Sequence, residues 1–206
     1  FNVNFAPDAD VITNSNNTVI GDRSFGTDAN IVTEYAAAYS SGLHSQNMRS
    51  TFKHFPGHGS TEGDTHEGFA YTNKTYEELM ESELVPFAHA QSNGVDFVMV
   101  AHISAPNIVG DNTPCTLSYK MISEVLRRDL NYNGLVITDA MNMGAIFNNY
   151  ASDTASILAV SAGVDLILMP GDFFGAAQGV INAVYNGQIS ESRIDTSVRR
   201  IITKKL

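Results

Sequence analysis

Short apolar runs alternate with longer amphipathic stretches along this chain, and this alternation constrains the fold more than any other feature of the sequence. Five runs have the length and the Val, Ile and Phe content of buried strands: 3–6, 50–55, 95–101, 135–138 and 164–169. Six stretches have helical periodicity: 28–46, 76–92, 118–130, 154–162, 173–185 and 190–204. Strands separated by helices indicate parallel pairing through right-handed crossovers.

Two architectures fit this alternation, an open doubly wound α/β sheet and a closed (β/α)8 barrel of the TIM type. Polar side chains stand where several of the runs end, which is where barrel enzymes gather their active sites: Asp8, Asp10, Lys53, His54, His102 and Asp139. No Gly-x-Gly-x-x-Gly turn follows any run, so the dinucleotide-binding form of the open sheet lacks its phosphate loop. The sequence therefore predicts a barrel.

We expect this barrel to be incomplete. Five strands do not close a barrel that needs eight. The first residues, FNVNFAP, already have the pattern of a buried strand, with no methionine, signal peptide or cap before them. Residues 1–206 are therefore predicted to be one barrel domain that lacks its early strands, which would lie before Phe1.

Charge and composition argue against several kinds of partner. The chain has 22 acidic and 12 basic side chains, a formal charge of -10, which disfavours the phosphate contacts that bind nucleic acid. It contains no run of about 18 apolar residues, so no membrane-spanning segment is expected. Cys115 is the single cysteine, which excludes an intrachain disulfide and offers one thiol to a zinc site.

Three histidines lie within one stretch, KHFPGHGSTEGDTH, at residues 53–66. His54 and His58 have the i, i+4 spacing of zinc ligands on a helix. Pro56 and Gly57 separate them, and proline inside a helix costs about 3 kcal/mol, so a strand end turning into a loop is predicted instead. A metal site on that loop stays open as an alternative, with these ligands: His54, His58, Asp64 and His66.

The same stretch ends in Asp64-Thr65-His66. Two residues apart in an extended loop, the carboxylate and the imidazole lie on one side of the chain, so Asp64 is able to orient His66. Imidazole has an ordinary pKa near 6.5 and exchanges protons near neutral pH. Asp-x-His triplets are common by chance, so this one is informative only in combination with other residues.

A second motif, GLVITDAMNMGAI at residues 134–146, places Asp139 at the C-terminal end of a predicted buried strand. Asp139 fits two roles, a cap for the following helix and a catalytic carboxylate. A carboxylate at one strand end and an Asp-His pair on another loop supply the nucleophile and the acid/base of a retaining glycosidase. Histidine then replaces the usual second carboxylate.

Five stretches occur in a fixed order: NFAPDADV, GDRSFGTD, KHFPGHGSTEGDTH, AHIS and ITDAMNM. Together they resemble the family 3 glycoside hydrolases, and specifically the β-N-acetylglucosaminidase (NagZ-like) branch. The signature of that branch is Lys-His-Phe-Pro-Gly-His-Gly followed after four residues by Asp-Ser-His, and Thr65 replaces the serine here. The family's barrel begins before NFAP with strands that include an Asp-x-Glu-Gly-Gly segment, which this chain lacks.

The resemblance implies a role for each matching residue. Asp139 would be the nucleophile, His66 the general acid/base and Asp64 its orienting partner. The implied sugar-binding and pocket-shaping residues are Lys53, His54, Arg23, His58, His102 and Met143. Asp10 also falls on a motif position, where we expect a structural role.

The implied activity is that of a retaining exo-β-N-acetylhexosaminidase acting on peptidoglycan fragments or chitooligosaccharides, with no metal and no organic cofactor. A β-glucosidase or β-xylosidase of the same family is an alternative, although such relatives take their acid/base carboxylate from elsewhere. Phosphate could also replace water as the acceptor, because neutral histidine repels an anion less than a carboxylate does. A metal-dependent barrel hydrolase and a non-catalytic carbohydrate-binding barrel are the remaining alternatives.

Overall fold

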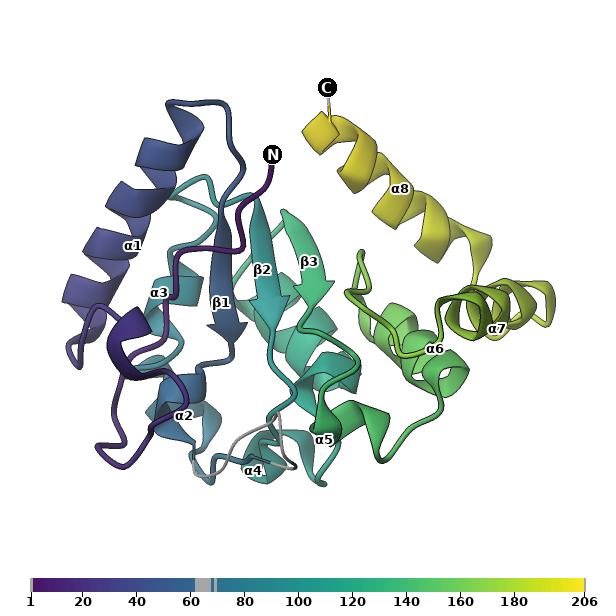
Figure 1. Ribbon diagram of the computed structural model, residues 1–206, viewed down its shortest axis with the longest axis horizontal. Helices are drawn as coiled ribbons and strands as arrows, with labels where there is room; N and C mark the ends of the chain where they lie inside the picture. The colour runs from purple at the N-terminus through teal and green to yellow at the C-terminus, as the bar shows by residue number, and fades with distance from the viewer. Residues whose placement is uncertain (1, 62–67, 69, 206) are drawn as a thin grey trace.

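The computed structural model describes residues 2–61, 68 and 70–205 of the chain (Figure 1). Its strands are β1 Thr51–Phe55, β2 Phe97–Val100 and β3 Leu135–Thr138. Its longer helices are α1 Ala29–His44, α6 Ser152–Ala162, α7 Phe173–Tyr185, α8 Glu191–Lys205 and the π-helix η4 Lys120–Asp129. Its short helices are η1 Gly21–Arg23, η2 His58–Ser60, α2 Tyr76–Met80, α3 Val85–Ala88, α4 Pro106–Val109, η3 Cys115–Leu117 and α5 Gly144–Phe147.

The three strands form one parallel sheet in the order β1-β2-β3, so all of their C-terminal ends lie at the same edge. Isolated parallel bridges extend the sheet on both sides. Asp8 pairs with Lys53 beside β1, and Leu166 pairs with Ile137 beside β3. The parallel arrangement expected from the alternating pattern is thus confirmed.

Two of the five predicted strands differ from expectation. Residues 3–6 and 164–169 make single bridges instead of strands, because each lies at an edge of the described sheet and has a hydrogen-bonded neighbour on one side. The predicted helix 76–92 is divided into α2 and α3, with Pro86 in the first turn of α3. Helices α1, α7 and α8 agree with their predicted ranges to within two residues.

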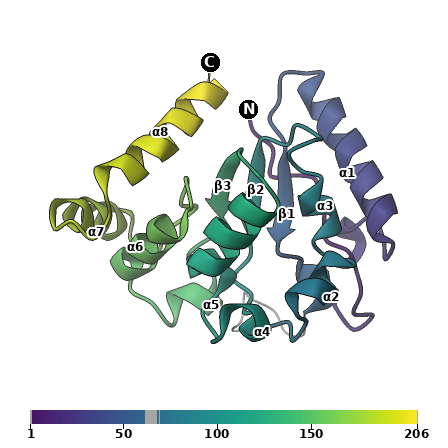
Figure 2. The same ribbon diagram turned by 180° about the vertical axis from the view of Figure 1, so that it is seen from behind.

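The sheet has a helix-covered face and an open face. Figure 1 views the strands from the side that no described helix crosses, and Figure 2 views them from behind, where helices cover them. Side chains alternate between these faces along each strand. In β2, Val98 and Val100 belong to the main core under the helices, whereas Phe97 and Met99 belong to a smaller apolar cluster on the open face.

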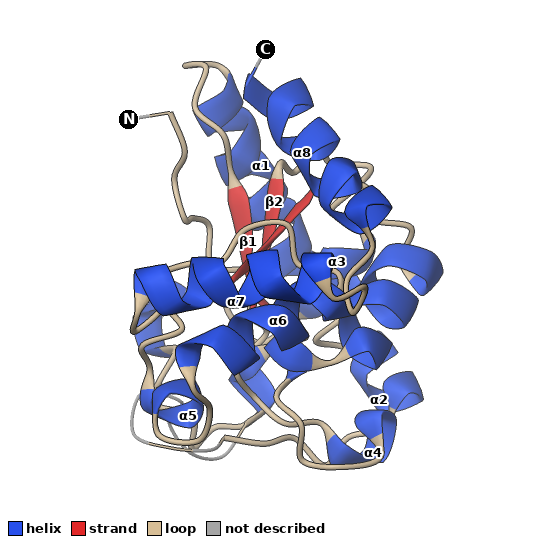
Figure 3. Cartoon of the chain, turned by 90° about the vertical axis from the view of Figure 1, so that its right-hand side faces the viewer, coloured by secondary structure: helices blue, strands red, loops and turns tan. Residues whose placement is uncertain are grey.

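Helices α6 and α7 pack against each other beside β3, and Figure 3 shows them lying across the sheet from that side. The α7 helix begins after Asp172, whose side chain accepts a hydrogen bond from the Gly175 N–H. Among the described residues, no helix is both long enough and apolar enough to cross a membrane.

Two buried carboxylates fix α8 at the edge where the strands begin. Asp96, just before β2, accepts hydrogen bonds from Lys204 of α8 (2.9 Å) and lies 2.7 Å from Nε2 of His44. Asp165 lies 2.6 Å from Arg127 of η4 and 3.2 Å from Arg200 of α8. These ion pairs hold the helices at the opposite edge of the sheet from the strand C-termini.

Candidate active site

A cavity of about 190 Å³ lies at the C-terminal edge of the sheet. Six of the residues that the sequence proposed for the site line it: Arg23, Lys53, His54, His58, Asp139 and Met143. They come from three separate parts of the chain, and the parallel pairing of the strands brings the second and third of these parts together. The sequence-based grouping of these six residues therefore corresponds to one place in the fold.

Asp139 directly follows β3, and its backbone N–H donates to the Val100 carbonyl (2.9 Å), which ties it to the end of β2. Its carboxylate Oδ1 accepts a hydrogen bond from the Ala140 N–H (2.8 Å). The next helix, α5, begins only at Gly144, and its N-cap position is Met143. Asp139 is therefore not a helix cap, and the half-buried carboxylate lines the cavity instead.

Lys53 and His54 lie in β1, and both line the cavity. His54 is almost completely buried, and its Nδ1 lies 2.7 Å from Oδ2 of Asp10. The Ala9 N–H donates to the Lys53 carbonyl (2.6 Å), so the segment that carries Asp8 and Asp10 runs alongside β1. The peptide bond between Lys53 and His54 is cis, the regular alternation of the strand is interrupted here, and both side chains line the same cavity.

His58 lies on the single turn η2, shortly after β1, so the chain here is a strand end that turns into a loop, as the sequence predicted, and not a helix that carries both His54 and His58. Gly57 has a positive φ of 121°, and a Cβ atom on Gly59 would lie 2.1 Å from the Val11 carbonyl oxygen. Glycine is thus needed at both positions. Asn17 Nδ2 donates to the carbonyls of His58 (2.8 Å) and Thr61 (3.2 Å), which fixes the turn against the preceding loop.

Arg23 ends the turn η1 and contributes a cationic side chain to the rim of the cavity. Its Nε and Nη2 donate to the carbonyls of Ile20 (3.2 Å) and Val19 (2.8 Å). Its Nη1 lies 3.7 Å from Oδ2 of Asp8. These contacts hold the guanidinium in place beside the sugar-binding candidates Lys53 and His54.

His102 lies behind the wall of the cavity and is fully buried. Its Nε2 donates to the carbonyl of Ala140 (3.0 Å), the residue that follows Asp139, and its Nδ1 lies 2.9 Å from the Thr116 hydroxyl. Burial lowers the pKa of His102, which favours the neutral imidazole. We expected His102 to line the pocket. Among the described residues it is not part of the lining, and it contacts the backbone beside Asp139 instead.

Asp64 and His66 fall outside the residues that the structure describes, and their roles stay predictions. The flanks of their loop are described. Asn14 Nδ2 donates to the Thr61 carbonyl (3.1 Å). On the other side, the Thr72 N–H donates to the Ser104 carbonyl (2.9 Å). Both flanks are therefore fixed at the edge where the strands end.

The charges beneath the cavity are unevenly distributed between two neighbouring carboxylates. Burial and the proximity of Asp10 raise the pKa of Asp8 to about 8. Burial also opposes the ionisation of Asp10, but the charge of His54 and its hydrogen bond outweigh burial and lower the pKa of Asp10 to about 2. The same pairing raises the pKa of His54 against the effect of its burial. At neutral pH, Asp8 is thus protonated and Asp10 ionised.

Within the described part of the chain, Asp8, Asp10 and His54 are the donor group close enough to share a metal ion, with ligand atoms within 4.8 Å of one another. Two ligands of one tetrahedral zinc ion lie about 3.3 Å apart. The 2.7 Å between His54 Nδ1 and Asp10 Oδ2 is instead a hydrogen-bonding distance. The cluster as it stands fits a proton between these atoms better than a metal ion.

The sequence did not reveal the apolar part of the cavity lining, which consists of Phe5, Val19, Ile20, Met99 and Leu168. Such residues carry no chemical signal, and only the three-dimensional fold distinguishes them from core residues. Leu168 is placed by its N–H, which donates to the Thr138 hydroxyl (2.9 Å) at the end of β3.

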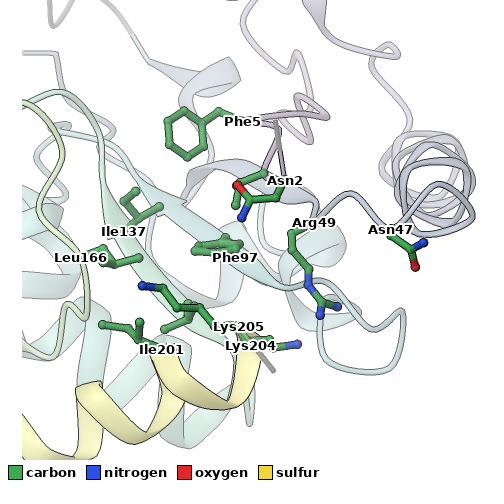
Figure 4. Close-up of a pocket in the computed structure, with 12 residues that line it drawn as sticks. Asn2, Phe5, Asn47, Arg49, Phe97, Ile137, Leu166, Ile201, Lys204 and Lys205 are labelled. Carbon is green, nitrogen blue, oxygen red and sulfur yellow. The ribbon is translucent and has the colours of Figure 1, made fainter.

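A larger hollow of about 640 Å³ lies on the open face of the sheet (Figure 4). Its floor is apolar, with Phe97, Ile137 and Leu166, and basic side chains such as Arg49 and Lys204 stand at its rim. Its described lining contains no carboxylate that could act as a nucleophile and no histidine that could exchange a proton near neutral pH. We therefore place the candidate active site at the smaller cavity.

Comparison with known proteins assigns this arrangement to a family. Residues 1–204 match the glycosyl hydrolase family 3 N terminal domain. The fold superposes with a TM-score of 0.96 on a family 3 β-N-acetylglucosaminidase from Paenibacillus sp., at 40% identity, covering 99% of this chain and 39% of the other. β-Hexosaminidase A of Pseudoalteromonas piscicida is 36% identical over 180 residues, 82% of this chain and 30% of the relative.

A third relative, β-hexosaminidase LpqI of Mycobacterium tuberculosis, is 34% identical over an alignment of 211 positions, which covers 98% of this chain and 54% of that protein. The parallel α/β fold and the site at its C-terminal edge are those of a glycoside hydrolase domain. The chain belongs to glycosyl hydrolase family 3, in its NagZ-like branch. It spans 30 to 54% of the length of these curated relatives.

Proposed function

We propose that the protein carrying this chain is a retaining exo-β-N-acetylhexosaminidase that releases terminal N-acetylglucosamine from peptidoglycan fragments or chitooligosaccharides. The observation that carries the proposal is the position of Asp139, whose half-buried carboxylate shares a cavity with Lys53, His54 and Arg23. The names of the relatives, β-hexosaminidase and β-N-acetylglucosaminidase, support the choice of sugar.

The proposed reaction has two displacements. In the first, an oxygen of Asp139 attacks the anomeric carbon, the glycosidic bond breaks, and His66 gives a proton to the departing oxygen. In the second, His66 takes a proton from water, whose oxygen attacks the same carbon and releases Asp139. Two inversions give net retention, and Asp64 orients His66 throughout. Lys53, His54 and Arg23 bind the hydroxyl groups of the sugar, and His58 shapes the site.

We also propose the finer architecture, a (β/α)8 barrel of which residues 1–206 form part. Five parallel segments in succession support it: the bridge-forming residues near Asp8, then β1, β2 and β3, then those near Leu166. The apolar side chains on the open face, including Phe97 and Ile137, match the inward-facing layer of such a barrel.

Replacing the nucleophile tests the mechanism. In the complete protein that carries this sequence, Asp139→Ala is expected to lower kcat by at least about 10⁴-fold, because no other group then forms the glycosyl-enzyme. Release of nitrophenol from the β-N-acetylglucosaminide measures it. A fluorinated N-acetylglucosaminyl substrate that slows the second step should leave a sugar on the peptide containing Asp139. Unchanged turnover, or a sugar on a different residue, would refute the assignment.

The same assay separates the alternatives. Higher activity on the nitrophenyl glucoside or xyloside than on the N-acetylglucosaminide would favour the alternative of a β-glucosidase or β-xylosidase. Sugar-1-phosphate among the products in phosphate buffer would identify a phosphorylase. Activity that disappears with chelators and returns with added metal would support a metal-dependent hydrolase instead.

A further inference from the structure

Asp10 lies directly beneath the cavity and is completely buried. Its Oδ2 accepts hydrogen bonds from the backbone N–H of His54 (3.1 Å) and from Nδ1 of the same residue (2.7 Å). Its Oδ1 accepts from the backbone N–H of His58 (2.5 Å). One carboxylate thus holds the end of β1 and the beginning of the turn η2.

The main chain that carries this carboxylate is itself held by hydrogen bonds. The hydroxyl of Ser24 donates to the Asp10 carbonyl (2.6 Å), and the adjacent Ala9 N–H donates to the Lys53 carbonyl (2.6 Å). Its position therefore depends on the preceding loop as well as on β1. A rigid acceptor restricts the rotation of the His54 ring, because the Nδ1 hydrogen bond is lost when the ring turns.

The contacts of His54 also determine what its other nitrogen offers to a ligand. With Nδ1 bonded to Asp10, Nε2 is the ring nitrogen left to face the cavity that His54 lines. Four titratable groups surround this ring: Asp8 and Asp10 below it, His58 on η2 and Asp139 at the end of β3. Three of the four are acidic, and Asp10 is the one in direct contact, so it favours a proton on both ring nitrogens.

We propose that Asp10 is a positioning residue for sugar binding, which acts through His54 by fixing its ring with Nε2–H directed at a hydroxyl group of the substrate. This inference rests on the proposed glycosidase function and goes beyond the structural role that the sequence suggested for Asp10. Asp10 itself is buried and does not line the cavity. Its effect is therefore expected on substrate binding and on the titration of His54.

The variant Asp10→Asn tests this proposal. An amide cannot accept from all three N–H groups or balance the imidazolium charge, so KM for the nitrophenyl N-acetylglucosaminide should rise about tenfold. The value of kcat should change less than about threefold, because Asp139 and the acid/base pair are intact. The pKa of His54, followed by NMR of histidine-labelled protein, should fall in the variant.

The chain offers a matched control in Asp96, a second buried aspartate that also lies 2.7 Å from a histidine nitrogen, that of His44. It stands at the opposite edge of the sheet, so Asp96→Asn should lower the melting temperature but leave KM and the His54 titration as in the wild type. Equal changes of KM in both variants would reduce Asp10 to a structural residue and overturn the proposal.

Two further outcomes are decisive. An Asp10→Asn protein with unchanged KM and unchanged His54 titration refutes the proposal. If that variant does not fold, the wild-type titration decides: His54 must titrate above the ordinary value of 6.5 and His58 below it, and the reverse order refutes it. Failure of the proposed function is a separate result, since it would appear as full turnover in Asp139→Ala while His54 of the wild-type protein still titrates above its ordinary value.

Discussion

Two aspartates separated by one residue behave oppositely beneath the candidate active site. Asp10 is ionised because three N–H groups converge on it, whereas Asp8 Oδ2 is buried with no hydrogen-bond partner among the described atoms. The side chains are identical, so the difference arises from the surroundings of each one, above all from the His54 imidazole that contacts Asp10. A sequence motif alone cannot distinguish such residues.

The proton on Asp8 makes the stability of the fold depend on pH. Its pKa is raised to about 8 from an ordinary value near 3.8, so between these pH values the folded state binds more protons than the unfolded state. The free energy of unfolding should therefore decrease as pH rises from about 4 to about 8. Asp8→Asn, which mimics the protonated form, should remove this contribution.

Thermal melts at pH 5 and pH 8.5 measure the effect. The wild-type melting temperature should fall more between these two pH values than that of Asp8→Asn. Parallel decreases in both proteins would contradict the protonated state assigned to Asp8.

At the scale of single elements, the short turn η2 follows β1 and places His58 in the lining of the cavity. Its formation depends on Gly59, whose Cα lies against the Val11 backbone. Gly59→Ala should destabilise the fold by about 2 kcal/mol or more, because the contact is with backbone that has little room to move. Activity should also fall, since η2 and His58 must shift.

Gly42→Ala provides the control for this substitution. Gly42 lies within α1, and a Cβ there would have no atom within 4 Å. Alanine in a helix interior is favoured over glycine by roughly 0.5–1 kcal/mol, so this variant should be slightly more stable than the wild type. Urea denaturation compares the two variants. A Gly59→Ala protein as stable as Gly42→Ala would refute the close packing of η2.

Regular elements were predictable because their signals are local. The α1 helix was expected from periodicity, and Asp28 caps it by accepting from the Asn30 and Ile31 N–H groups. The parallel sheet followed from apolar runs separated by helices. The division of 76–92 into two helices was missed, although Pro86 lies in the interior of the predicted range and disfavours a continuous helix there. In the structure Pro86 occupies the first turn of α3, where proline is tolerated.

The candidate site was predictable only where residues carry chemistry. Asp139, Lys53 and His54 stand at strand ends, so the parallel topology alone brings them together. Two features depended on tertiary contacts and could not be read from the chain. His102 turns to the Ala140 carbonyl instead of the cavity, and Asp10 joins His54 to the turn η2.

At the scale of the whole molecule, Asp165 joins the sheet to two helices. Its fully buried carboxylate accepts from the Val136 N–H (3.0 Å), contacts Arg127 of η4 and Arg200 of α8, and bonds the Ser197 hydroxyl (2.5 Å). Asp165→Ala should cost about 3 kcal/mol or more of unfolding free energy, because it leaves buried arginine charge unpaired. Hydrogen exchange should show α8 losing protection first.

The exposed pair of Glu124 and Lys120 on η4 supplies the contrast. Glu124→Ala removes a solvent-screened ion pair and should leave the denaturation midpoint nearly unchanged. Equal losses of stability in the two variants would show that the Asp165 network contributes no more than a surface pair.

The separation of the two edges of the sheet has a consequence for protein engineering. The ion pairs of Asp96 and Asp165 lie where the strands begin, and the chemical groups lie where they end. Thermostabilising changes usually reduce activity when they stiffen a catalytic region. In this domain, additional charge pairs around α8 would strengthen the base of the sheet while the loops at the other edge stay free to be redesigned for other sugars.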